Sequence, residues 1–240
     1  MKKAFTFTEI MVSLTIIGFI VVLVLPLFYN TYGSKVVSAQ LKKACVMVTN
    51  AAKHIITDER SNDLSSLESD FDANAVVDDD GNVHALGFYN TTAGVKTSNA
   101  EQGAQYFLNN YFKHTKTNCG TGGSGECVGE SYRTPDNRQV SFPTTFYCIK
   151  TINDSAICMR FNENLNCTEV LIDVNSQDKP NVTGSDVFSM FITHDGFLQD
   201  LSEDETHCNA QTDLNTDDIV KYSAGCFYKI LAKSWNMRDY

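Results

Sequence analysis

The stretch KKAFTFTEIMVSLTIIGFIVVLVLP, residues 2–26, decides the fold of this 240-residue chain. The 19 residues from Ile10 to Phe28 carry no charge, and as a helix they would measure roughly 28 Å, about the thickness of a bilayer core. Because the apolar run is longer than a signal-peptide core and continues into more helix, we expect a membrane helix rather than a cleavable signal peptide. Lys2 and Lys3 precede it, so the positive-inside rule predicts a cytoplasmic N-terminus and an exported remainder.

A second helical pattern follows the apolar run without a break. Apolar residues recur at spacings of three and four, which predicts an amphipathic helix with one buried stripe; they are Val37, Leu41, Ala44, Val48, Ala51 and Ile55. The two parts together predict one helix of about 50 residues, roughly 75 Å long. Pro26 should bend it, because proline removes a backbone hydrogen bond and clashes with the preceding turn.

The chain from about residue 60 is rich in turns and in strand-forming residues. We expect two short strands in 75–88, a short helix in 101–113, and hairpins in 146–161 and 187–198, the first turning near Asn153 and Asp154 and the second at Asp195 and Gly196. One long helix followed by a mostly antiparallel sheet is an α+β fold. The expected organisation is 1–4, a short leader; 5–29, the transmembrane half of the helix; 30–58, its amphipathic half; and 59–240, a globular head.

Charge and cysteine content restrict the function classes. The net charge of −10 argues against nucleic-acid binding, which needs a basic face. Eight cysteines in an exported domain predict disulfides, whereas the absence of any Cys-x-x-Cys pair argues against zinc. Cys148 and Cys158 lie equally far from the turn near Asn153 and should face each other across the hairpin.

The remaining cysteines are paired with less geometric support. Proximity pairs Cys119 with Cys127, closing a glycine-rich loop that lacks the Lys-Ser/Thr of a phosphate-binding loop. Cys208 is paired with Cys226 near the C-terminus, which leaves Cys45 and Cys167 as the last pair. The five histidines show neither metal-ligand spacing nor a nearby nucleophile motif, so we expect no enzyme activity.

The opening stretch resembles the N-terminus of type IV pilin-like proteins, including the pseudopilins of type II secretion. In that family a membrane aspartyl protease, the prepilin peptidase, removes a short basic leader, and the new N-terminal residue is N-methylated. The resemblance implies that Ala4 precedes the cut, that Phe5 is methylated, and that Glu9 pairs with the N-terminal amine of a neighbouring subunit during assembly. Here alanine stands where the family usually has glycine, and the leader is only four residues long.

A second segment, DVNSQDKPNVTGSDVF at residues 173–188, is similar to a loop found in many secretion pseudopilins. Asp173, Asn175 and Asp186 would supply the hard oxygen ligands that calcium prefers, and Asp178 would be able to join them. The loop is not an EF-hand, because its sixth and twelfth positions are Asp178 and Gly184. The alternative interpretation is a pair of Asx turns, in which these side chains bind their own backbone.

Three functions follow from these patterns. The first is a structural subunit, stored in the bacterial inner membrane and assembled into a type II secretion pseudopilus or a type IV pilus-like filament. The second is a minor tip subunit or binding module of such a filament, and the third is an exported enzyme tethered by its helix. The first implies three partners: the prepilin peptidase, other pilin or pseudopilin subunits, and an inner-membrane assembly platform.

Overall fold

A computed structural model gives the structure of the chain. It describes residues 6–58, 76–77, 83–85, 91–92, 95–96, 100–116, 119, 127–143, 145–162, 167–193, 196–210, 212–214, 216, 218–235 and 237. Residues 1–5, which include the expected leader, lie outside these residues, as do most of 59–99. The proposed leader cut after Ala4 therefore lies outside the described residues.

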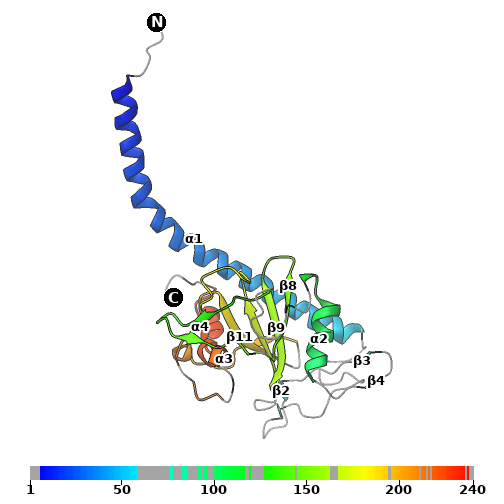
Figure 1. Cartoon of the computed structure of the whole chain (residues 1–240). Coiled ribbons are helices and arrows are strands. Elements are labelled where there is room, and N and C mark those ends of the chain that lie inside the picture. The colour runs from blue at the N-terminus through cyan, green and yellow to red at the C-terminus, as the bar shows by residue number, and fades with distance from the viewer. Residues whose placement is uncertain are drawn as a thin grey trace.

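The N-terminal helix α1 runs from Phe7 to Asp58 without interruption. Its N-terminal half projects away from the rest of the molecule, and the helix bends before its second half reaches the head (Figure 1). None of the window Phe7–Val24 is buried, and by length and composition this part can cross a membrane. The second half buries Leu41, Ala44, Val48, Ala51 and Ile55, the stripe expected from the sequence. Val37, the first residue of that stripe, is partly buried against the same cluster.

The head is built on a six-stranded antiparallel sheet of order β12-β11-β10-β9-β8-β5, which confirms the α+β class. Its strands are β5 (His114–Lys116), β8 (Tyr147–Thr151), β9 (Ala156–Asn162), β10 (Cys167–Asp173), β11 (Val187–Ile192) and β12 (Leu198–Gln199). The two expected hairpins are present as β8–β9 and β11–β12. Strand pairing places Cys148 directly opposite Cys158.

Smaller elements surround this sheet. The short pairs are β1 (Val76–Val77) with β2 (Val83–Ala85), β3 (Thr91–Thr92) with β4 (Val95–Lys96), and β6 (Tyr132–Arg133) with β7 (Gln139–Val140). The helices are α2 (Ala100–Tyr111), α3 (Asp218–Ser223) and α4 (Cys226–Ala232), with one 3-10 turn, η2 (Glu205–His207). The strands expected in 75–88 and the helix expected in 101–113 correspond to β1, β2 and α2.

Side chains on the two faces of the sheet enter two different cores, because neighbouring residues of a strand point to opposite faces. Val170 and Ile172 of β10 join α1, α2 and α4 in the larger apolar cluster. Leu171, between them, joins the second cluster with Ile219 and Val220 of α3. The sheet is therefore covered on both faces, by α1 on one and by α3 on the other.

The amphipathic half of α1 is also fixed by three loops of the head. Lys43 Nζ lies 2.5 Å from Asn153 Oδ1 in the β8–β9 turn, and Ser38 donates to the carbonyl of Trp235 near the C-terminus. In the β11–β12 turn, a Cβ added at Gly196 would lie 2.8 Å from the Cβ of Ala52. Glycine at this position lets the turn approach the helix closely, so helix and head form one packed unit.

The structure contains three disulfides, Cys119–Cys127, Cys148–Cys158 and Cys208–Cys226, which join the three short-range pairs expected from the sequence. The fourth pairing, Cys45 with Cys167, is wrong, because Cys45 is a free and buried thiol. Cys45 lies beside the buried stripe of α1 and packs in the larger cluster as a small apolar side chain. Desolvation by burial raises the pKa of this thiol to about 12, so it stays protonated.

Candidate functional site

The N-terminal half of α1 is the first candidate site, because it presents apolar side chains to the surroundings on all faces. Large residues such as Phe19 and Val22 are about two-thirds exposed in the isolated chain. An exposed apolar surface of this length needs a bilayer or other apolar helices around it. Within the described part of the chain, no other helix has the length and composition to cross a membrane.

Glu9 lies in the first turn of α1 and bonds to Thr6, the residue just before the helix. Glu9 Oε2 accepts from the backbone N–H and the hydroxyl of Thr6, both at 2.8 Å. The hydroxyl oxygen of Thr6 in turn accepts from the backbone N–H of Glu9 at 3.3 Å. This reciprocal arrangement is a capping box, which satisfies backbone donors at a helix start. The carboxylate thus has intramolecular donors in the single chain, a role that the Thr-x-x-Glu spacing would have predicted.

The loop between β10 and β11 is the second candidate site, and it gathers two of the expected ligands. Asp173 and Asp186 are both buried. Tyr132 Oη donates to Asp173 Oδ2 at 2.7 Å, while the backbone N–H groups of Asn181 and Val182 donate to Asp186 at 2.8 and 2.6 Å. All three of these donors are neutral hydroxyl or backbone amide groups.

Burial of these two carboxyl groups disfavours their ionised forms. Desolvation by burial raises the pKa of Asp173 well above its ordinary value, and the neighbouring carboxylate of Asp186 adds to that rise. Burial likewise raises the pKa of Asp186, although the N–H groups of Val182 and Asn181 oppose it. A bound cation would stabilise both ionised forms and reverse these shifts.

Two amide oxygens in the same loop have no hydrogen-bond donor among the described residues. They are the buried Oδ1 atoms of Asn175 and Asn181, and a buried oxygen without a donor costs about 1–3 kcal/mol. Asn175 is one of the expected ligands, whereas Asn181 was not predicted, although it lies in the same polar loop. Asp178 is exposed and does not join the buried set.

The donor set of the loop fits calcium in chemistry: two carboxylates and two amide oxygens that lack donors, all of them hard oxygen ligands. No group of three or more His, Cys, Asp or Glu side chains with metal-binding geometry occurs among the described residues. A cation here would therefore have to be completed by amide or carbonyl oxygens or by water. Asx-turn bonding is also present, since Asp173 Oδ1 accepts from the Asn175 N–H at 3.3 Å.

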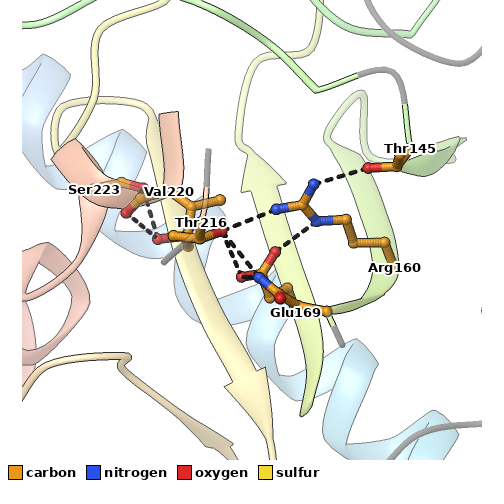
Figure 2. A network of polar contacts seen from close by, with 8 residues as sticks. Thr145, Arg160, Glu169, Thr216, Val220 and Ser223 are labelled. Carbon is orange, nitrogen blue, oxygen red and sulfur yellow. Dashed lines mark hydrogen bonds and ion pairs between the residues drawn. The ribbon is translucent and has the colours of Figure 1, made fainter. Parts of the chain in front are cut away.

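A buried ion pair on the α3 side of the sheet was not predicted from the sequence. Figure 2 shows Arg160 of β9 reaching Glu169 of β10, with Thr145 and Thr216 beside them. Arg160 Nε lies 2.6 Å from Glu169 Oε2, and the hydroxyl of Thr216 accepts from Arg160 and donates to Glu169 Oε1. The guanidinium carbon also lies 4.6 Å from the ring centroid of Phe146.

The network joins the segment before α3 to the sheet through Thr216. Its signal in the sequence is the spacing of Arg160 and Glu169, which are opposite each other once β9 and β10 are paired through Asn162 and Cys167. The spacing is informative only when that register is known. The contacts above join segments of the head to one another, and we assign the network a structural role.

Comparison with protein families, with curated proteins and with solved structures finds no match.

Proposed function

We propose that this chain is a pilin-like structural subunit that a prepilin peptidase processes and that assembles into a type II secretion pseudopilus or a type IV pilus-like filament. The observation that carries the proposal is the form of α1. One continuous helix has an apolar half with no buried residue in Phe7–Val24 and a second half packed on the head. Its one charged side chain in the described part of the apolar half is Glu9, in the first turn.

The physics of this helix supports storage followed by assembly. Lipid tails and apolar sister helices satisfy such a surface about equally well, so the same segment can reside in the inner membrane and later in the core of a filament. The head, continuous with the helix, would then lie on the exported side. Pairing of Glu9 with the amine of a neighbouring subunit would fix the register of each added copy, because a carboxylate in an apolar core needs a partner.

Intact-mass measurement of the chain from native membranes tests the processing step. We expect loss of Met1 to Ala4 and one methyl group on Phe5. Retention of Met1 would exclude processing and would leave a simple membrane tether. A cut beyond residue 25 would instead identify a signal peptide, and either result would contradict the proposal.

Substitution of Glu9 tests the assembly step. The variant Glu9→Gln should insert into the membrane and fold its head normally, because residue 9 lies in the half of α1 that does not contact the head. Incorporation into filaments should fall strongly when the variant is the only copy. Ser13→Ala, one turn further along, serves as the matched control and should assemble normally. A normal filament yield from Glu9→Gln would contradict the registry role.

We also propose that the β10–β11 loop binds calcium through Asp173, Asn175 and Asp186, with Asn181 as an added ligand. The support is the pair of buried carboxylates and the two amide oxygens without donors. When bound, calcium would supply the positive charge that these carboxylates lack. By binding the same ion, these four residues would hold the loop closed just before β11.

Thermal unfolding of the full chain in detergent tests this site. A ligand bound only by the folded state at about 100 times its Kd adds roughly 2.7 kcal/mol, so millimolar calcium should raise the melting temperature relative to excess chelator. Asp173→Asn should abolish the shift. Asp178→Asn, at the exposed position of the same loop, should retain it. A melting temperature of the parent protein that is the same in calcium and in chelator would favour the Asx-turn interpretation.

A further inference from the structure

Charge is divided sharply between α1 and the head. From Ile10 to Thr57 the helix contains four lysines and no Asp or Glu, whereas residues 59–240 contain 13 Lys and Arg against 27 Asp and Glu. The four lysines are all exposed on the amphipathic half. We call them the basic stripe: Lys35, Lys42, Lys43 and Lys53.

The described contacts leave the charges of the basic stripe uncompensated. Lys42 lies over the ring of Trp235 and Lys53 over the ring of Phe197, at 5.7 and 5.2 Å from the centroids. Lys43 bonds to the amide oxygen of Asn153. Neutral groups thus hold three of the four ammonium groups in place, and the ion pairs among the described residues involve none of the four. Asp154, which lines the same 240 Å³ cavity as Lys43, is paired with Lys150.

The position of the stripe argues against the bilayer as its main partner. Lys43 is 15 residues beyond Phe28, the end of the uncharged apolar run, which corresponds to about 22 Å along the helix. The polar region of a bilayer extends only about 5–8 Å beyond the hydrocarbon core. If α1 spans the membrane, Lys35 is the lysine of the stripe nearest to the lipid headgroups, and Lys42, Lys43 and Lys53 lie further along the helix, where a protein surface is the favoured partner.

An exposed acidic surface exists on the head. Glu203, Asp204 and Glu205 are consecutive and exposed at the start of η2; we call them the acidic turn. Asp204 caps η2 by accepting from the Thr206 N–H at 2.9 Å, and the Cys208–Cys226 disulfide ties the segment to α4.

The base of the acidic turn is fixed just before it. Asp200 accepts from the N–H groups of Gly225 and Tyr228 at 2.6 and 2.8 Å. The acidic turn is therefore a preorganised surface rather than a loose loop, which lowers the entropy cost of binding.

We propose that the basic stripe of one copy binds the acidic turn of a second copy of the chain, with Lys42 and Lys43 as the main contacts. The two surfaces have opposite charge and belong to different parts of the fold. Contact between two different surfaces of identical chains is heterologous, and such contacts propagate into open helical polymers when the rotation between copies does not close a ring. The inference rests on the proposed filament function and adds the surfaces through which successive heads and helices recognise each other.

Zero-length carbodiimide cross-linking tests the contact, because it joins a lysine to a carboxylate only when they touch. Full-length chain, half of it labelled with nitrogen-15, is placed in neutral phosphatidylcholine vesicles, cross-linked and digested for mass spectrometry. We expect Lys42 or Lys43 joined to Glu203 or Glu205 in peptides of mixed isotope. The yield should fall at 1 M salt, where the Debye length is about 3 Å.

Charge reversal provides the matched variants. Lys43→Glu should lower the mixed-isotope yield at least about fivefold, the size expected for loss of a partly exposed ion pair. Adding Glu205→Lys should restore it. The control Lys113→Glu, at an exposed position outside the stripe, should leave the yield unchanged. Cross-links confined to one isotope, or directed to other carboxylates, would overturn the proposal.

Two further outcomes separate this contact from its alternatives. The chain is also placed at high dilution in phosphatidylglycerol vesicles and treated with an acylating reagent. If these vesicles protect Lys42 and Lys43 from the reagent, lipid is the occupant and the proposal is overturned. Filaments that depend on Glu9 but give no such cross-link would refute this contact and leave the proposed function standing. Cross-links between copies without Glu9-dependent filaments would support this contact and contradict the proposed function.

Discussion

The two halves of α1 are one helix with opposite relations to their surroundings. Residues 7–24 bury nothing within the chain, whereas Leu41 and Val48 in the second half are completely buried against the sheet. Both halves contain many Leu, Ile and Val residues. What differs is their arrangement: apolar side chains cover the whole circumference in the first half and form a single stripe in the second. The arrangement determines whether a helix belongs to its own fold or to a membrane or an assembly.

Matched leucine truncations in the two halves should show the largest difference. Leu41 is fully buried and Leu14 is 61% exposed. Leu41→Ala should lower the free energy of unfolding of the head by about 3 kcal/mol, through lost burial and the cavity left behind. Leu14→Ala should change it by less than about 0.5 kcal/mol, as is usual for positions outside the packed fold. Chemical denaturation of the full chain in detergent measures both, and equal losses would contradict the division of the helix.

A pH-dependent prediction concerns Asp200, which anchors α4 and with it the C-terminal segment that covers α1. Burial raises the pKa of Asp200 to about 6, above the ordinary value of 3.8. The folded state therefore binds this proton more tightly than the unfolded state. The stability that results is fully present below about pH 3.8 and is lost as the pH rises through about 6, an effect of roughly 2–3 kcal/mol.

The variant Asp200→Asn should remove this part of the pH dependence. The free energy of unfolding of each protein is measured by denaturation at several pH values between 4 and 7. Plotted against pH, it should fall more steeply for the parent than for the variant. Asp173 and Asp186 have raised pKa values as well, but they are unchanged in both proteins, so the difference isolates Asp200. Parallel plots of unfolding free energy against pH would show that the Asp200 carboxyl titrates normally.

The contact between α1 and the β11–β12 turn should be sensitive to a single methyl group. Gly196 has a φ of 76° and would place a Cβ 2.8 Å from that of Ala52. Gly196→Ala should cost about 2 kcal/mol, since it combines an unfavourable backbone conformation with overpacking. Ala52→Gly as a second change should relieve only the overpacking. A double-mutant cycle by thermal unfolding separates the two contributions, and purely additive losses would contradict the close approach.

The smallest effect is expected at the start of α1, in the half that does not pack on the head. Thr6→Val removes the hydroxyl that accepts from Glu9, a loss worth about 1 kcal/mol at a helix start. Amide exchange at Phe7 to Glu9 in lipid nanodiscs should become about fivefold faster, with no change in the unfolding of the head. Thr6→Ser retains the hydroxyl and should exchange like the parent. Faster exchange in both variants would show that the hydroxyl is not the cap.

The sequence by itself determined the features that depend on short spacings. The length of the apolar run, the stripe from Val37 to Ile55, the hairpin at 146–161 and the three short-range cysteine pairs all follow from periodicity and from residues near one another in the chain. Local rules govern these features, because a helix face or a tight hairpin is set by residues a few positions apart.

Tertiary structure alone decided the features that depend on strand register and packing. Arg160 meets Glu169 only when β9 and β10 pair through Asn162 and Cys167, and Cys45 remains a thiol because the helix stripe places it in the apolar core. The oxygens of Asn175 and Asn181 that have no donor among the described residues, and the three lysines of α1 held by neutral groups, likewise depend on how the chain packs. Such contacts depend on the whole packed chain, since the hydrophobic effect that assembles it is non-directional and fixes no particular pair in advance.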